Sequence, residues 1–253
     1  MIYRELEELF EVKFKQYNTP DFIQNDPISI PHQFSIQQDI EVIGFITAII
    51  AWGKRAMIIS NAEKLIQLMD YQPYNFILNY QGQFKGTKAF KHRTLNSEDL
   101  DFICRSLQRC YSLHNSLEAW FYLTKNQKGI KQRIINFRNE FLVTEHTSRS
   151  EKHIANPEKG SAAKRINMFL RWMVRKDTNG VDFGLWDSIQ MSELYIPLDV
   201  HTGNTARKLG LLHRKQNDWK ALEEIMTHLQ KLDPKDPSKY DFALFGLGIN
   251  KEV

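Results

Sequence analysis

Residues 159–175, "KGSAAKRINMFLRWMVR", join a short run of small residues to a strongly amphipathic segment. Beyond the small residues, apolar side chains recur at the three- and four-residue spacing of a helix. The pattern predicts a helix from about Ala162 to Arg175. Its inward face is expected to hold Ile166, Phe169, Trp172 and Met173. Residues 144–163 contain almost no large apolar side chain, so a loop is expected before this helix.

The same helical spacing recurs along nearly the whole chain, and no segment shows a convincing strand period. Further helices are expected at 3–17, 36–52, from 60 onward, and at 97–111, 115–124, 129–142, 203–209, 218–231 and 238–248. Capping boxes at Ser35 and Ser60 indicate where two of these helices begin, and Asp236 followed by Pro237 indicates the N-cap of the last one. Gly210 indicates where the helix at 203–209 ends. The proline-containing stretch 18–34 is expected to be an extended connection, and residues 71–96 to be irregular. The predicted class is all-α.

Composition limits the classes of protein further. The chain has 253 residues, which suits one large domain or two small lobes, and 42% of them are hydrophobic, enough for a core. A net charge of +4 permits a polyanionic partner without requiring one. Cys104 and Cys110 have no metal-binding spacing and are expected to be buried thiols. The longest apolar run is too short to span a bilayer and the first residues do not resemble a signal peptide, so a cytoplasmic protein is expected.

Lys164 lies at the expected start of the amphipathic helix. A helix start exposes unpaired N–H groups that can hold a phosphate. The apolar side chains of Ile166 and Phe169 behind Lys164 would exclude water, which disfavours the ammonium form and leaves more free amine. A free amine can attack a sugar C1′ and form a Schiff base. The alternative is an ordinary solvated lysine on a basic helix, which from position alone is the better interpretation.

Asp199 ends an apolar run within "SELYIPLDVHTGNTARKLGLL", residues 192–212. A carboxylate in this position could stabilise an oxocarbenium ion that develops on a sugar, or help to deprotonate a nucleophile. The alternative is a helix N-cap, and both roles are compatible. His201, two residues later, is expected to pack or form hydrogen bonds rather than act as a catalytic base.

Asp241 and Phe245 are one helical turn apart in "YDFALFGLG", residues 240–248, and therefore share a face. One could hydrogen-bond the edge of an extruded base while the other stacks on its ring. The alternative is that Phe245 belongs to the core and Asp241 interacts with the helix dipole. The sequence does not favour either interpretation.

The segments "AAKRINMFL" and "PLDVHTGNTARKLGL" resemble the helix-hairpin-helix DNA glycosylase superfamily, over about 158–175 and 195–248. By this resemblance, Lys164 aligns with the Schiff-base lysine and Asp199 with the catalytic aspartate. The long gap between them looks more like the archaeal-type 8-oxoguanine glycosylase branch than the endonuclease III branch. Arg171 matches a basic position of that branch, and Asp241 with Phe245 looks like its base-holding pair. The chain as a whole also resembles a bacterial family of unknown function that is common in Bacteroidetes.

The resemblance implies a single functional unit, residues 1–253, of two helical lobes with a central cleft. One lobe would comprise 33–165 and end in the hairpin, and the other 1–32 with 166–253. Lys164 and Asp199 would face each other within hydrogen-bonding distance or across one water. Trp52 and Gln38 would join the base pocket. The DNA backbone would be bound by Lys159, Gly160, Arg165, Arg171, His201, Arg207 and Lys208.

The implied function is DNA base-excision repair: a DNA N-glycosylase with AP lyase activity on an oxidised purine, chiefly 8-oxoguanine. No cofactor or metal is implied, and the four cysteines of an iron–sulfur cluster are missing from the sequence. The partner would be damaged double-stranded DNA, and the protein a nucleoid-associated monomer. The sequence departs from the usual pattern at Ala162, in place of a hairpin glycine, and at Val200, in place of a threonine. These departures favour a second hypothesis, a non-catalytic nucleic-acid-binding protein that retains the fold.

Overall fold

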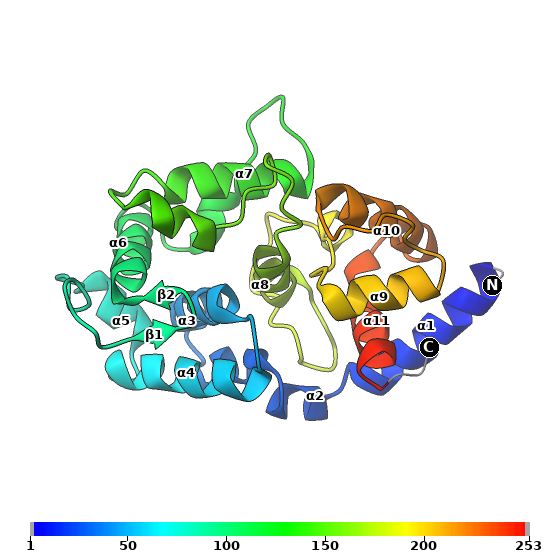
Figure 1. The fold of residues 1–253 in the computed structure, drawn as a ribbon, viewed down its shortest axis with the longest axis horizontal. Helices are drawn as coiled ribbons and strands as arrows, with labels where there is room; N and C mark the ends of the chain where they lie inside the picture. Colours follow the sequence, from blue (N-terminus) through cyan, green and yellow to red (C-terminus); the bar gives the residue numbers. More distant parts are fainter. Residues whose placement is uncertain (1–2, 251–253) are drawn as a thin grey trace. The chain divides into compact units, whose positions relative to one another are not determined.

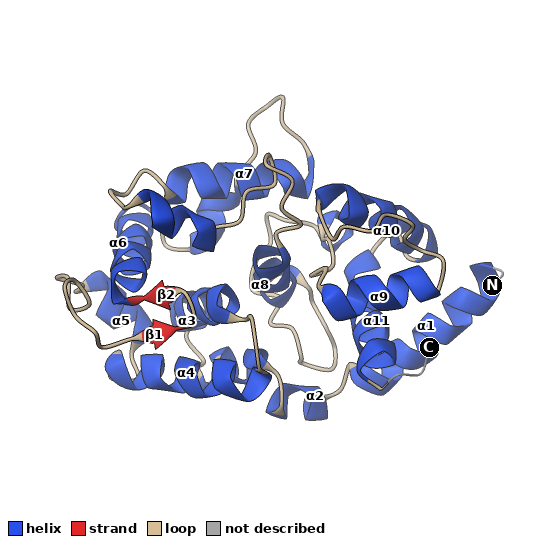
Figure 2. Cartoon of the chain, viewed as in Figure 1, coloured by secondary structure: helices blue, strands red, loops and turns tan. Residues whose placement is uncertain are grey.

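The computed structural model describes residues 3–250, and most of them are helical (Figures 1 and 2). The all-α prediction is therefore confirmed. The sheet structure within residues 3–250 is one short antiparallel hairpin, β1 (Lys91–His92) with β2 (Leu95–Asn96). No helix in this part of the chain is both long and apolar enough to cross a membrane.

The chain forms two compact units. Unit 1 combines the residues up to Gln24 with those from Asn156 onward, and unit 2 is the continuous segment Asn25–Ala155. The boundaries expected from the sequence were 32/33 and 165/166. The second boundary observed, before Asn156, assigns the turn that precedes Lys164 to the same unit as the helix that follows it.

Unit 1 brings the first and last helices of the chain together. Its elements are α1 (Tyr3–Tyr17), α2 (Pro20–Gln24), α8 (Lys164–Val174), η5 (Met191–Glu193), α9 (Val200–Lys208), α10 (Trp219–Leu232), η6 (Pro237–Lys239) and α11 (Tyr240–Ile249). The ribbon shows α11 lying against α1 and α9 (Figure 1). Gly246 permits the contact with α1, because a Cβ atom there would lie within 2.0 Å of the Tyr17 ring. The core of unit 1 therefore depends on a pairing between the two ends of the sequence.

Unit 2 is built around a helix that is buried on almost every side. Its elements are η1 (Pro27–Ser29), η2 (Pro31–Gln33), α3 (Gln37–Ile50), α4 (Arg55–Leu68), α5 (Pro73–Leu78), β1, β2, α6 (Ser97–Leu113), η3 (Leu117–Phe121), α7 (Gly129–Phe141) and η4 (Ser148–His153). The central helix, α3, packs on α4 and α5. It carries one fully buried acid, Glu41, which accepts hydrogen bonds from Tyr111 Oη, Ser116 Oγ and the Leu117 N–H at 2.7–2.8 Å. Glu41 thereby joins α3 to the end of α6 and to η3.

Several local predictions are wrong. Residues 18–34 are not extended, because their three prolines each occupy the first position of a short helix, α2, η1 or η2. Ser35 forms no cap, since the N-cap of α3 is Ile36 without a side-chain hydrogen bond. Ser60 lies inside α4, which begins at Arg55. Residues 71–96 contain α5 and the β1–β2 hairpin, and the expected helix at 115–124 is the 3-10 helix η3.

The expected loop 144–163 contains η4, which is held by a buried acid of α6. The Asp99 carboxylate accepts hydrogen bonds from Ser150 Oγ at 2.7 Å and Arg149 Nη1 at 2.8 Å. Its pKa lies well below the usual range: burial opposes this, but the hydrogen bonds from His153 and Ser150 outweigh it. The polar composition that predicted a loop thus fits a segment that packs through hydrogen bonds instead of apolar contacts.

Two local predictions near the candidate site are confirmed, the buried face of α8 and the helix stop at Gly210. The inward face of α8 is buried as expected, at Ile166, Phe169, Trp172 and Met173. Gly210 follows the end of α9 with a φ of +74°, the left-handed conformation that favours glycine at a helix stop. Helix α9 begins earlier than expected, at Val200, because Asp199 caps it.

Candidate active site

The turn before α8 is fixed to the start of α10. Gly160 has a φ of +86°, and the Ser161 N–H donates to the Asn156 carbonyl at 3.1 Å. Ser161 forms an isolated antiparallel bridge with Asp218, and the Trp219 N–H donates to the Gly160 carbonyl at 2.9 Å. The main chain that leads into α8 is therefore held by hydrogen bonds on both sides. Gly160 is required for its conformation and not for space, since a Cβ there would meet nothing within 4 Å.

Lys164 is the first residue of α8 and is half-buried. It follows Ala163, a buried residue in the left-handed conformation (φ 48°, ψ 37°). The Lys164 ammonium donates to the Met168 sulfur at 3.7 Å, one turn further along the helix. This contact, together with the buried apolar face behind it, agrees better with the desolvated lysine than with the fully solvated alternative.

Asp199 is the N-cap of α9, as one of its two interpretations predicted. Its Oδ1 accepts a hydrogen bond from the Thr202 N–H at 2.9 Å. Its main-chain carbonyl accepts from Asn217 Nδ2 at 2.8 Å, which ties the start of α9 to the loop before α10. The capping role fixes the carboxylate in space. A direct contact between Asp199 and Lys164 stays a prediction.

Asp241 connects the two predicted catalytic residues electrostatically. It lies in the first turn of α11, is only 6% exposed, and forms an ion pair with Arg171 Nη1. Burial raises its pKa to about 7, since Arg171 opposes the shift only partly. The Asp199 carboxylate raises this pKa further and Lys164 lowers it. These effects fall off with distance, so the three side chains form one electrostatically coupled group.

Phe245 lies one turn after Asp241 on the same face of α11. It is half-buried and meets the ring of Phe22 edge-on, with ring centroids 6.1 Å apart. Part of the ring is therefore packed and part is accessible. Both side chains are packed yet neither is completely enclosed, and a role of the pair in holding a base stays a prediction.

Arg171 does not face solvent, so its expected role in binding the DNA backbone is wrong. Its side chain is 3% exposed, pairs with Asp182 and Asp241, and lies 4.4 Å from the ring centroid of Phe242. One turn later, Arg175 is equally buried and pairs with Asp182 at 3.1 Å. Two further carboxylates complete the cluster around Arg175, those of Asp177 and Asp236.

This buried cluster holds more acid than base: two arginines against four aspartates. Such an excess favours retention of a proton on one of the carboxyls, because uncompensated buried charge is costly. The raised pKa values of Asp182 and Asp241 agree, and burial is the main cause for both. The sequence analysis missed Arg175, Asp182 and Asp236. The available signal was the pair of arginines one turn apart on an otherwise buried helix, which requires buried acids nearby.

The other residues expected to bind a DNA backbone have different environments. Lys159, His201 and Lys208 are exposed. Arg165 is half-buried, and desolvation lowers its pKa to about 10, so it stays protonated at neutral pH. Arg207 is committed within the chain, because its N–H groups donate to the carbonyls of Arg214 and Lys215 at 2.9 Å and to Asn217 Oδ1. Arg207 therefore holds the loop after α9, and its contact with phosphate stays a prediction.

Trp52 and Gln38, the speculative pocket members, belong to unit 2. The Gln38 amide donates to the Asn115 carbonyl at 3.1 Å, so it is used within that unit. Trp52 is half-buried, and the Arg93 guanidinium lies 4.6 Å from its ring centroid. These contacts support neither residue as a base-holding group.

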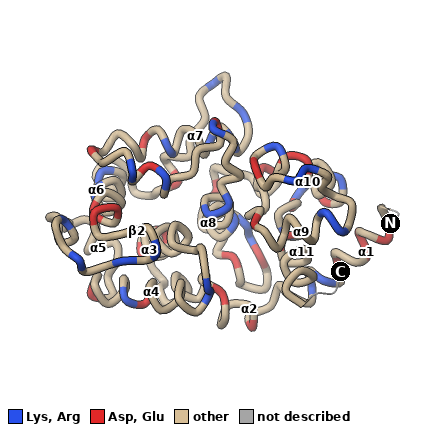
Figure 3. The backbone as a smooth tube through the Cα atoms, viewed as in Figure 1, with Lys and Arg blue, Asp and Glu red and all other residues tan. Residues whose placement is uncertain are grey.

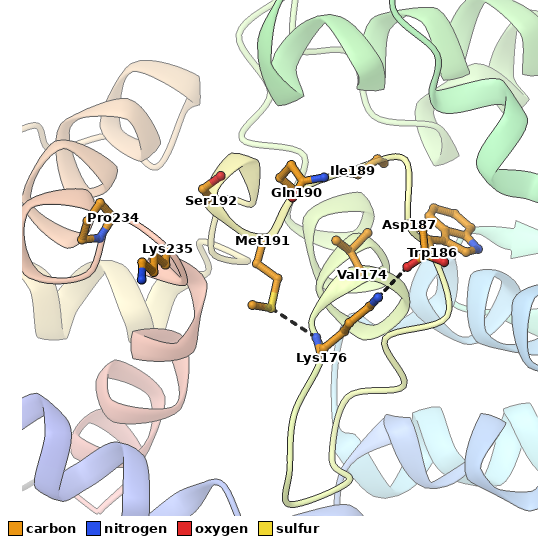
Figure 4. Close-up of a pocket in the computed structure, with 10 residues that line it drawn as sticks. All are labelled: Val174, Lys176, Trp186, Asp187, Ile189, Gln190, Met191, Ser192, Pro234 and Lys235. Atoms are coloured by element: carbon orange, nitrogen blue, oxygen red, sulfur yellow. Dashed lines mark hydrogen bonds and ion pairs between the residues drawn. The ribbon is translucent and has the colours of Figure 1, made fainter.

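A separate pocket of about 520 Å³ lies at the opposite end of α8 (Figure 4). Its apolar wall includes Val174 and Ile189, and Lys176 pairs with Asp187 at 2.5 Å along its edge. Val174 ends α8 and Lys164 begins it, a separation of roughly 15 Å at 1.5 Å per residue. The pocket contains none of the titratable groups described above, so the coupled group at the start of α8 is the better candidate for chemistry.

No three His, Cys, Asp or Glu side chains within residues 3–250 are grouped as metal ligands. Cys104 and Cys110 are buried free thiols, as predicted, and burial raises the pKa of both. The titratable side chains at the start of α8 are the amine of Lys164 and the carboxylates of Asp199 and Asp241.

Comparison with known proteins identifies one family. The model of a family described as "Protein of unknown function (DUF2400)" matches residues 26–250, most of the chain. No curated protein and no solved structure matches the sequence.

Proposed function

The chain belongs to the DUF2400 family, and we propose that it is a DNA base-excision repair glycosylase with AP lyase activity on an oxidised purine, with 8-oxoguanine as the substrate. The proposed fold is the two-lobed helix-hairpin-helix glycosylase fold, and the proposed partner is damaged duplex DNA in the cytoplasm. One observation carries the proposal. Lys164, half-buried directly after a hydrogen-bonded turn, and the capping residue Asp199 both act electrostatically on the buried Asp241.

In the proposed reaction, the Lys164 ammonium first releases a proton to water, and the resulting neutral amine attacks C1′ of the damaged nucleotide. The bond between C1′ and the base breaks, and its electron pair leaves with the base, which takes up a proton. The new C–N centre loses a proton and the sugar ring opens, which gives a Schiff base between Nζ and C1′. Loss of a proton from C2′ then expels the 3′ phosphate and cleaves the strand.

The two carboxylates would act differently. Asp199, held at the N-cap of α9, would stabilise positive charge that develops on the sugar. Asp241 has a pKa of about 7, so near neutral pH a large fraction of it is protonated and able to donate an O–H to a carbonyl of the base. Phe245, on the same face, would stack on the ring.

The non-catalytic alternative is favoured by one specific observation. Arg207, expected to bind phosphate, is committed to hydrogen bonds within the chain. A protein that kept the fold and lost the chemistry would bind DNA without cleaving it.

Borohydride trapping separates these functions. The protein is mixed with a labelled duplex that contains one 8-oxoguanine, or one abasic site, and sodium borohydride reduces any Schiff base to a stable covalent bond. We expect a covalent band that Lys164→Ala abolishes. Lys220→Ala is the matched control, since Lys220 is an exposed lysine of the same unit with no proposed role in DNA binding. Absence of a band on both duplexes, with duplex binding retained, would refute the enzyme and support the binding protein.

A further inference from the structure

We propose that an exposed basic surface on unit 2 binds the phosphate backbone of nucleic acid. This surface, which we call the basic hairpin surface, consists of Lys54, Lys85, Lys88, Lys91 and Arg93. It shares no residue with the candidate active site in unit 1. The choice of nucleic acid as the partner rests on the proposed function, whereas the positive charge and its arrangement do not.

The charge of this surface is nearly unopposed. Residues 81–94 contain three lysines and one arginine and no acid, and Figure 3 colours the charged positions along the backbone. All four cations are exposed. Within residues 3–250 none of the five cations forms an ion pair. One acidic side chain contacts the loop from outside, Glu98, which accepts from the Gly86 N–H at 2.8 Å. The surface therefore has a clear positive excess, which is the electrostatic signature of a polyanion site.

Arg93, at the tip of the β1–β2 hairpin, has a left-handed backbone conformation that is energetically unfavourable for arginine. Arg93 and Thr94 form the two-residue loop between β1 and β2, since His92 pairs with Leu95. The favoured two-residue loops require a positive φ at their first position, where glycine or asparagine is the usual residue. Arg93 occupies that position with a φ of 55°. A strained residue at an exposed loop tip suggests a function that outweighs the strain.

The Arg93 guanidinium is also held in place. It lies over the Trp52 ring, 4.6 Å from the centroid. Gly53 (φ +110°) makes room for it, because a Cβ there would lie 3.0 Å from Arg93 Nη1. His92 Nε2 lies 3.2 Å from the Trp52 carbonyl and so links the hairpin to the same loop. A guanidinium held on an aromatic face is well suited to contact phosphates or bases, whereas an anionic membrane surface would require only charge.

Binding of an undamaged duplex tests this surface, with fluorescence anisotropy measured over a range of salt concentrations. The triple variant Lys85→Gln, Lys88→Gln, Lys91→Gln should bind at least tenfold more weakly, because each phosphate contact is worth about eightfold at 0.1 M salt. The slope of log K against log salt should fall by up to about 2.7. The matched control replaces three other exposed lysines, Lys15, Lys125 and Lys128. Equal affinity of the two triple variants would overturn the proposal.

Arg93→Gly separates binding from folding. Glycine relieves the strained turn, so the melting temperature should stay the same or rise while the affinity for the duplex falls. Unchanged affinity would overturn the role of Arg93. The triple variant is also tested on vesicles of anionic lipid, and loss of vesicle binding with full duplex binding would overturn the choice of partner. Lys164→Ala should leave duplex binding intact, so a failure of borohydride trapping is distinguishable from a failure of this surface.

Discussion

The proton on Asp241 gives the most direct test of the buried charge cluster. Its pKa is raised to about 7 in the folded chain, mainly by burial, from an ordinary value of 3.8. The folded state therefore retains a proton that the unfolded state releases as pH rises above 3.8. Unfolded chains then bind fewer protons, so stability falls as pH rises through this range, and the loss is complete only above pH 7. Between pH 5 and pH 8 the expected loss is about 2–3 kcal/mol, at 1.36 kcal/mol per pKa unit.

Asp241→Asn removes this dependence, since asparagine does not titrate. The measurement is the free energy of urea unfolding at pH 5, 6, 7 and 8 for both proteins, and the quantity of interest is their difference. Effects of the other groups that act on Asp241, namely Arg171, Asp199, Lys164 and Asp182, remain in both proteins and largely cancel. The control Asp187→Asn changes an exposed aspartate and should give a flat difference. A flat or rising difference for Asp241→Asn would refute the reasoning that burial dominates this pKa.

Three further substitutions test the structure around the site. Asp199→Asn should keep the helix cap and change the free energy of unfolding by less than about 0.5 kcal/mol. Asp199→Ala should lower the free energy of unfolding by about 1 kcal/mol in the same urea titration. Both variants should impair the trapping reaction if the negative charge of Asp199 is required. Asp182→Ala should cost about 1–3 kcal/mol, because it removes the acceptor that Arg171 and Arg175 share, although Asp241, Asp177 and Asp236 stay paired with the two arginines; an unchanged free energy of unfolding would contradict the network. Gly246→Ala should lower the melting temperature and detach α1 from α11, because the new methyl group would overlap the Tyr17 ring. If the melting temperature and the protection of the α1 amides from hydrogen exchange were both unchanged, the result would argue against that packing.

The sequence predicted features that depend on neighbouring residues. The apolar spacing along α8 correctly gave its buried face, and Asp199 before a helical segment was correctly weighed as an N-cap. Gly210 was correctly taken as a helix stop. All of these follow from spacing of a few residues, at which helix geometry relates sequence directly to structure.

One prediction failed because the deciding partners are distant in the chain. Arg171 was expected on the DNA-facing surface, as isolated basic residues usually are exposed. Arg171 instead meets Asp182 and Asp241, eleven and seventy residues away. A charged side chain can be buried where the fold places groups of opposite charge beside it, and the local sequence spacing does not show where those groups will lie.

The sequence by itself determined that this protein is all-α, which helix faces are buried, and that a lysine begins the helix after a small-residue turn. Only the tertiary structure decided which charges act together. Burial and the meeting of α8, α9 and α11 join Lys164, Asp199 and Asp241 into one electrostatic group and raise the pKa of Asp241. The physical reason is that helix formation depends on contacts between residues within one turn. The energy of a charged side chain instead depends on all the charged and polar groups that folding places near it and on the water that folding removes.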